Sequence, residues 1–578
     1  MRMLRIATVG VALAASATAN AQQVEPILFT LDNGMEFMLY PRDEQPNIIA
    51  AGWLAKVGSV NERPGITGIS HYLEHMLFKG TGTIGTSDLE ADRMSHDKQR
   101  QLQDRLLSQV VGVQYDRWRR GEISDPWDAS YDTDEMRDIR KQLREVVDAH
   151  KEHVVTNEFD RVYTTKGASG MNAFTSHDLT MYFINVPSNK FELWAWMESD
   201  RLFNPSFREF VSENGVVIEE RKQVLESTPT GRIDEQIDSV FWSSTPYSWP
   251  IVGWPSDISG YAYDNLTGYF DTYYDPSNLV GIVVGDFDPD EVRPVIEQYF
   301  GRLESTNPVI PPVVTLPVQP AFEKRIDAEC DCQTRVRVMY PAPPFRHADG
   351  YVLEVLAGIL NGRTGRLYKS MVEGDEIADQ AGASYQPRKY GGALEFIGFP
   401  KNDATTADLE AAWEREIEKL KAEPVTDREL QKIKNQTIAD SFRRLQSNFF
   451  ILVQLGYYEG LGGWEYMNES PEQIQAVTAD DIMRVANTYF DHSVRTVATY
   501  TRQEADLTNM DPELAALEPA QREQVQMMLA QMGQAPIEQL RQIMPMMEQQ
   551  AAQVPAEDKA AFDYVLKKLR ERLESEDN

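Results

Sequence analysis

The sequence predicts an α+β fold of two related domains, each with a mainly antiparallel sheet packed against helices, plus an inserted helical hairpin and a helical C-terminal extension. Strand-like alternating runs and amphipathic helical runs occur on both sides of a proline-rich segment at 305–320. The segments YDNLTGYFDTYYDPS (263–277) and ADDIMRVANTYFDHS (479–493) match as a helix followed by an apolar run. Their equivalent residues Thr272 and Thr488 lie 216 positions apart, so we predict a duplicated α+β unit of about that length.

The N-terminus is predicted to be a secretory signal peptide. Arg2 and Arg5 precede an apolar run, and the small residues around Ala21 suit a cleavage position. We therefore expect cleavage near Ala21 and an exported mature protein, periplasmic or secreted. The apolar run is too short to cross a bilayer comfortably, and no later segment reaches the roughly 20 apolar residues of a membrane span. No cysteine follows the cleavage position, which argues against a lipid anchor.

The first domain is predicted to begin with strands and a short helix. Asn33-Gly34 lies between two alternating apolar runs, which predicts a hairpin. Residues 47–59 are typical of a core strand, and residues 68–78 of a helix. A second β signal at 170–187 precedes a helical stretch that we expect to run from about residue 190 to residue 227.

Residues 89–154 form a charge-rich amphipathic insertion. A break at DPWDAS predicts two helices that project from the body as a hairpin. We expect its histidines, His96, His150 and His153, to lie among solvated charges and not to bind a metal. The resulting organisation is a signal peptide at 1–21, a first domain at 22–304 with this insertion, a linker at 305–320, a second domain at 321–504 and an extension at 505–578.

Cys330 and Cys332 are the only cysteines. One intervening residue makes a mutual disulfide strained, and two sulfurs are too few for a structural zinc site. We therefore expect Cys330 and Cys332 to be two small residues on one face of a strand. The extension after Glu504 is rich in Gln and Met at helical spacing, and we expect docking helices or a partner surface. A soft-metal box is the alternative for its methionines, although Met is usually a flexible packing residue.

The overall charge excludes one class of partner. Lys and Arg total 57 against 90 Asp and Glu, a net charge of −33. Binding to nucleic-acid phosphates needs the opposite sign, so we expect no nucleic-acid partner. The acidic balance is typical of a solvated acidic surface, and it is compatible with basic peptides as partners.

The stretch GISHYLEHMLFKGT (68–81) is the candidate chemical motif. His71 and His75 lie four apart on the predicted helix, so both can direct a ring nitrogen at one ion. Zinc prefers such donors, together with a third ligand and an open position for water. Glu74 lies on an overlapping face, where it can take a proton from that water. The alternative is a chance pair of histidines, so a third ligand is required.

Candidates for the third ligand lie in FVSENGVVIEERKQVLE (210–226), which carries Glu213, Glu219, Glu220 and Glu226 on one predicted helix. Glu213 and Glu220 are two helical turns apart and share an apolar face, whereas Glu219 is turned about 100° away. A carboxylate that faces apolar neighbours is either paired or coordinating. The spacing favours Glu220 or Glu213 over Glu219 and leaves those two open.

Taken together, these motifs resemble those of the M16 peptidase family, the group of pitrilysin, insulysin and mitochondrial processing peptidase. HYLEHMLFKGT resembles its inverted zinc motif, H-x-x-E-H. NAFTSHDLTMY (172–182) is similar to its N-A-x-T strand, and SENGVVIEE (212–220) to its E-x-x-x-V-x-x-E helix. YYDPSNLVGIVVGDFD and GRTGRLYKSMVE are similar to later segments, and the likeness covers about residues 25 to 500.

The resemblance implies the M16 and LuxS-like metallohydrolase fold and one Zn²⁺ per chain. The implied zinc ligands are His71, His75 and Glu220, with Glu74 as general base and Glu213 as a carboxylate behind the ligands. It also implies an edge strand to which a substrate peptide adds, with Asn172, Ala173 and Thr175 on it. The expected activity is hydrolysis of peptides or unfolded polypeptides by a metal-activated water within a closed chamber.

Two departures from the family bear on this expectation. His75 and Glu220 are 145 residues apart, farther than in the family, and the insertion accounts for most of the excess. An Arg and a Tyr that bind substrate in many members would align with Val372 and Asp379, which cannot do so. Arg366, Tyr385 or a second subunit would have to replace them. The shorter family members pair two chains, so we expect a homodimer or a heterodimer with another M16-type subunit.

Two further functions are weighed against the peptidase. A non-catalytic or partner-dependent subunit of the same fold, acting in binding or assembly, is favoured by the missing Arg and Tyr. It is opposed by the intact His71, Glu74, His75 and Glu220. A metal-storage module built on the Met-rich tail would predict copper binding by residues 505–578 alone.

Overall fold

The computed structural model describes residues 23–306, 308–503, 510–533, 535, 537–551, 554–555 and 558–576. The predicted signal peptide at 1–21, with its cleavage position near Ala21, lies outside these residues. Within the described ranges, no helix is both long and apolar enough to cross a bilayer.

The first half is built on a six-stranded mixed sheet. Its spatial order is β1-β2-β6-β3-β5-β4, and only the β2/β6 pair is parallel. The predicted Asn33-Gly34 hairpin joins the first two strands, because Gly34 adopts a positive φ of 89° that other residues avoid. The strands are β1 (Ile27–Thr30), β2 (Glu36–Pro41), β3 (Ile48–Ala55), β4 (Ser169–Thr175), β5 (Thr180–Pro187) and β6 (Leu279–Gly285).

Helices cover both faces of this sheet. One face carries the largest apolar core, in which the buried side chains of Trp53, Tyr182 and Trp194 lie with those of the metal-motif helix α1. The other face packs against α15, which comes from the second half. The helices of the first half outside the insertion are α1 (Ile69–Met76), α5 (Glu158–Thr164), α6 (Phe191–Phe203), α7 (Phe210–Arg221), α8 (Gly231–Phe241), α9 (Pro255–Ser259), α10 (Tyr263–Tyr273) and α11 (Pro289–Phe300).

The second half repeats the architecture of the first. Its sheet has the order β7-β11-β8-β10-β9 with only β7/β11 parallel, which matches β2-β6-β3-β5-β4 strand for strand. The two similar sequence segments form α10 before β6 and α17 before β11, at equivalent places. The elements are β7 (Lys324–Cys330), β8 (Arg335–Ala342), β9 (Ala378–Arg388), β10 (Gly391–Pro400), β11 (Thr496–Arg502), α12 (Ala348–Leu360), α13 (Thr406–Ala422), α14 (Asp427–Arg444), α15 (Asn448–Leu461), α16 (Tyr466–Ala476) and α17 (Ala479–Tyr489).

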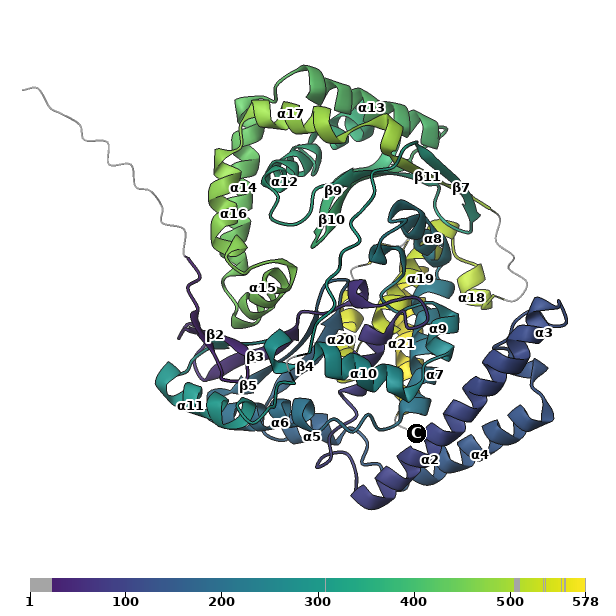
Figure 1. The fold of residues 1–578 in the computed structure, drawn as a ribbon. Helices are drawn as coiled ribbons and strands as arrows, with labels where there is room; N and C mark the ends of the chain where they lie inside the picture. The colour runs from purple at the N-terminus through teal and green to yellow at the C-terminus, as the bar shows by residue number, and fades with distance from the viewer. Residues whose placement is uncertain are drawn as a thin grey trace, which may run out of the picture.

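The predicted α+β class with mainly antiparallel sheets packed against helices is therefore confirmed. Figure 1 shows the second sheet above the first, with α12, α13, α14, α16 and α17 above it and to its left. Between α11 and β7 the described residues form no helix or strand.

The insertion forms the predicted helical hairpin. Its helices α2 (Leu89–Gln109) and α4 (Asp134–His150) lie against each other and extend away from the body, with the short α3 (Tyr115–Arg119) near the tip (Figure 1). A small core joins the helices, made by Leu102, Leu106, Val110, Met136, Ile139 and Leu143.

One expectation for this insertion is wrong, because His150 is buried and not solvated. Its exposed fraction is 3%, and its ring contacts Asp92 Oδ1 at 2.6 Å and the Gln99 side chain at 3.0 Å. The helix pattern of α4 could not reveal this burial, because the ring packs against α2, which carries Asp92 and Gln99. His96 is partly buried and lies edge-on against the ring of Tyr263.

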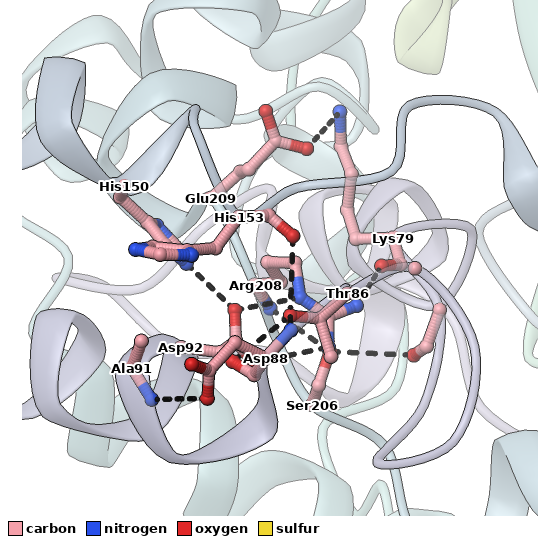
Figure 2. A network of polar contacts seen from close by, with 12 residues as sticks. Lys79, Thr86, Asp88, Ala91, Asp92, His150, His153, Ser206, Arg208 and Glu209 are labelled. Atoms are coloured by element: carbon pink, nitrogen blue, oxygen red, sulfur yellow. Dashed lines mark hydrogen bonds and ion pairs between the residues drawn. The ribbon is translucent and has the colours of Figure 1, made fainter.

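Buried Arg208 fastens the base of the hairpin to the body (Figure 2). Its guanidinium contacts both carboxylate oxygens of Asp92, at 2.9 and 3.0 Å. It also donates to three main-chain carbonyls in the segment that follows α1, those of Lys79, Thr81 and Ile84. Although burial opposes the shift, the bonds from His150 and Arg208 lower the pKa of Asp92 to about 2.

Arg208→Gln is expected to loosen the hairpin base. Removing one partner of a buried ion pair leaves the other charge uncompensated, which costs about 3–5 kcal/mol. Hydrogen exchange should therefore accelerate in α2 and α4, relative to Arg93→Gln, which alters an exposed arginine of the same hairpin. Equal exchange in the two variants would contradict the anchoring role.

The predicted long helix after residue 190 is divided into α6 and α7. Pro205 has no N–H to continue α6, and Phe207 and Glu209 adopt positive φ angles of 44° and 64° before α7 begins. The helix α7 then continues into a π-helical turn, Lys222–Glu226, which we call the π-turn.

The expectation for Cys330 and Cys332 is also wrong, because the two form a disulfide. Cys330 ends β7 and Cys332 lies in the turn to β8, so the two do not occupy one straight strand. The turn brings their Cα atoms to 5.2 Å, and both side chains are buried in a shared apolar cluster.

The C-terminal extension is helical, as predicted. It comprises α18 (Pro512–Ala515), α19 (Pro519–Gly533), α20 (Ile537–Gln550) and α21 (Lys559–Glu576), joined by their own apolar core. Met544 and Met547 are buried in that core and Met528 and Met532 pack against it, whereas Met527 and Met546 are exposed. Most of these methionines therefore serve packing.

Candidate metal centre

The helix α1 that carries the histidines has a defined start. Gly68 precedes it with a φ of 87°, and a Cβ there would meet the Val252 carbonyl at 2.2 Å, so glycine is required on both counts. The carboxylate of Glu62 accepts from the main-chain N–H groups of Gly68 and Ser70, at 2.7 and 2.8 Å. This cap satisfies donors that the first turn leaves unpaired.

Three predicted residues converge where α1 faces α7. His71 Nε2 lies 3.6 Å from Glu220 Oε1, and His75 Nε2 lies 3.3 Å from Glu220 Oε2. One potential ligand atom from each of the three lies within 4.8 Å of the others. The hydroxyl of Tyr72 donates to the carbonyl of Phe210 and thus links the two helices.

The donor set fits a zinc ion. Two imidazoles and a carboxylate are the donors of catalytic zinc sites. Glu220 Oε2 is buried and makes no hydrogen bond to any described residue, although it faces the imidazole of His75. A buried acceptor without a partner is costly, and a cation at this point would satisfy it.

The alternative ligand Glu213 has a different place. Its Oε1 lies 2.8 Å from His75 Nδ1, and its Oε2 forms an ion pair with Lys79 at 2.5 Å. A carboxylate on the far ring nitrogen orients a ligating imidazole. Glu219, which the spacing disfavoured, is exposed and pairs with Lys222.

The two histidines of the site have opposite pKa shifts. Burial opposes the shift, yet the hydrogen bond with Glu213 and the nearby negative charge of Glu220 raise the pKa of His75 to about 10. Burial is the main reason that the pKa of His71 is lowered to about 4. His71 thus favours the neutral form that a metal ligand needs.

Glu74 lies beside these three residues, on the helix α1 that also carries His71 and His75. Burial raises its pKa to about 7, while the bond from Thr175 lowers it in part. The hydroxyl of Thr175 donates to Glu74 Oε2 at 2.6 Å. Thr175, predicted to bind substrate, therefore also holds the carboxylate in one orientation.

Asn172, Ala173 and Thr175 lie on β4, which is an edge strand. Among the described residues β4 pairs only with β5, and its other edge is open. All three line the same cavity as His71, His75 and Glu220. A strand edge of this kind can accept an extended peptide through main-chain hydrogen bonds.

A cavity of about 2280 Å³ contains these groups. Its walls include α1, β4 and α7, and also the C-terminal extension, which no sequence motif connects with the site. The residues from the extension are Gln526, Leu529, Ala530, Gln531, Ala535, Ile537, Gln539, Arg541, Lys568 and Arg572. Only the docking of the extension brings them here, so no local signal could have found them.

The candidates for the family's missing Arg and Tyr lie elsewhere. Arg366 pairs with Glu429 at 2.9 and 3.2 Å, and Tyr385 donates its hydroxyl to the carbonyl of Pro343. Neither is among the residues that line the cavity. Val372 packs at the margin of the second core.

Known families match the chain in two places. The model of the insulinase peptidase family M16 matches residues 37–96, which include α1 and end within the insertion. The model of the M16 inactive domain matches residues 261–437.

Individual relatives cover most of the chain. The zinc protease PqqE of Helicobacter pylori is 24% identical over 486 residues, which is 83% of this chain and 94% of that protein. The crystal structure of a protease from Helicobacter pylori aligns with a TM-score of 0.66 and 22% identity, over 82% of this chain and 99% of the other. The periplasmic protease PqqL of Escherichia coli aligns with a TM-score of 0.60 and 14% identity, over 88% of this chain and 50% of the other.

The fold is that of solved proteases, the sequence relatives include proteins named zinc proteases, and the helix α1 carries the inverted motif H-x-x-E-H. The chain belongs to the M16 (insulinase) peptidase family.

Proposed function

We propose that the chain is an exported zinc-dependent endopeptidase that hydrolyses peptides or unfolded polypeptides. One observation carries the proposal: His71, His75 and Glu220 converge beside the buried carboxylate of Glu74, in a cavity that an open strand edge also lines. Family membership and relatives named zinc proteases support the same activity.

In this proposal His71, His75 and Glu220 hold one Zn²⁺ per chain. Bound zinc supplies a Lewis acid that polarises the substrate carbonyl and lowers the pKa of a water from about 16 towards about 7. Glu74 accepts the proton of the attacking water and delivers it to the leaving nitrogen. Thr175 keeps Glu74 oriented through its hydroxyl, and Glu213 fixes the ring of His75.

The substrate is proposed to bind as an additional strand along β4, past Asn172 and Ala173. Main-chain hydrogen bonds hold an extended peptide with little regard to its sequence. Folded proteins do not offer such a free strand, which restricts the substrates to peptides and unfolded chains.

The proposed setting is the periplasm or the cell exterior, after removal of the signal peptide near Ala21. The crystal structure of PqqL, a fold relative, is described as that of a periplasmic protease. Assembly as a homodimer or a heterodimer is part of the proposal, and its support is the resemblance to the shorter M16 members.

The test combines metal analysis with cleavage of a peptide library. We expect about one zinc per chain, turnover of extended peptides and loss of turnover after chelation, with recovery when zinc is restored. Zinc-loaded protein without turnover, alone or mixed with a candidate M16 partner, would contradict the proposal. Turnover in the mixture alone would instead favour the alternative of a partner-dependent subunit.

A further inference from the structure

The C-terminal extension lies across the metal-site cavity, where it supplies part of the wall. Figure 1 shows α19, α20 and α21, in yellow, near the centre of the molecule. Side chains of α19 and α21, among them Gln526, Leu529 and Arg572, line the cavity that contains His71, His75 and Glu220. A substrate strand on β4 would therefore lie in the same cavity as side chains of these helices.

A buried ion pair anchors the extension to the second half. Glu523 of α19 contacts Arg335 of β8 at 2.9 Å, and the two residues are 3% and 7% exposed. The other oxygen of Glu523 accepts from the main-chain N–H of Gln333 at 2.6 Å. Such a pair fixes α19 at one position, because either charge alone would be buried without compensation.

The neighbouring residue makes a second anchor. Arg522 contacts both oxygens of Asp331, at 3.1 and 3.3 Å, and also donates to the carbonyls of Ala515 and Leu517. Asp331 lies between the disulfide-bonded Cys330 and Cys332, so the turn that presents it is cross-linked.

The anchored helix α19 also contacts the first half of the chain, next to the helix that carries Glu220. α19 contacts the π-turn, Lys222–Glu226, which continues the helix that carries Glu220. The extension thus bridges the turn between β7 and β8 in the second half and the metal-binding helix of the first half.

We propose that helices α19 and α21 form a built-in selectivity cover, which admits a single extended polypeptide to the metal site and excludes loops of folded proteins. This inference rests on the proposed peptidase function. One extended strand needs about 4.8 Å beside β4, whereas a loop with its folded domain needs much more room on the side that α19 and α21 occupy. The cover thus supplies part of the wall of the cavity that contains the metal site, whereas Arg366 and Tyr385 do not line it.

The test uses the full-length protein with two variants that release α19 from the second half, Glu523→Gln and Asp331→Asn. The matched control is Glu518→Gln, which makes the same charge change at an exposed residue immediately before α19. The first measurement is hydrogen exchange of the π-turn in metal-free protein, which does not depend on activity. The second compares kcat/KM for a short library peptide with kcat/KM for the same sequence in a surface loop of a folded carrier domain.

We expect both anchor variants, but not the control, to lose protection at the π-turn. We also expect the ratio of loop cleavage to peptide cleavage to rise about tenfold in them. Unchanged protection in both variants would overturn the docking, and lost protection with an unchanged ratio would overturn the selectivity. If the wild-type protein cuts no peptide, the proposed peptidase function and with it the selectivity fail, while hydrogen exchange still decides the docking.

Discussion

Glu74→Gln is expected to bind zinc as the wild-type protein does and to cleave peptides about 10²–10⁴ times more slowly. The amide retains the shape of the side chain but cannot take the proton of the attacking water. Glu74 is not one of the three residues whose ligand atoms converge, so the metal should remain. The measurement is zinc content together with kcat on a library peptide.

Glu219→Gln is the control for that variant. It removes a carboxylate from the same cavity, but one that is exposed and paired with Lys222. It should retain both zinc and turnover. Substantial turnover by Glu74→Gln would show that another group moves the proton, and loss of zinc would show that Glu74 holds the ion.

Glu220→Gln is expected to lose the metal itself. Its carboxylate faces both imidazoles, and no other acid among the described residues of α7 is placed to replace it, since Glu213 is engaged with His75 Nδ1 and Lys79. The loss of zinc affinity should exceed the roughly 10–100-fold typical of residues behind the ligands. Zinc affinity can be measured by competition with a chelator.

The adjacent Glu219→Gln again gives the comparison. The two adjacent glutamates have the same side chain but point in directions about 100° apart around the helix, so that only Glu220 faces the imidazoles. A Glu220→Gln protein with wild-type zinc affinity would refute the metal centre as proposed, and the peptidase function with it.

Much of the fold could be predicted because its signals are local. The Asn33-Gly34 hairpin, the helix of the H-x-x-E-H motif and the paired helices of the insertion follow from turn chemistry and hydrophobic period. The duplicated halves were visible from two short matching segments, and the two sheets repeat the same strand order. The linker and domain boundaries stay predictions.

Other features depended on contacts between distant segments. The helix pattern predicted His150 among solvated charges, but the ring is buried against Asp92. Cys330 and Cys332 were expected on one strand, but a turn between β7 and β8 joins them in a disulfide. In each case the local sequence pattern was compatible with both arrangements, and the packing of the folded chain determined which one formed.

The sequence by itself determined that His71, Glu74 and His75 share one side of a helix, because residues three and four apart must do so. It also narrowed the third donor to Glu213 or Glu220. Only the tertiary structure gave the two glutamates different places, since the way α1 lies against α7 directs Glu220 at the Nε2 atoms of His71 and His75 and Glu213 at the Nδ1 atom of His75. The part of the cavity wall that the C-terminal extension supplies also depended on the tertiary structure. Buried charge pairs hold the extension there, and no periodicity in the sequence indicates which segments dock against each other.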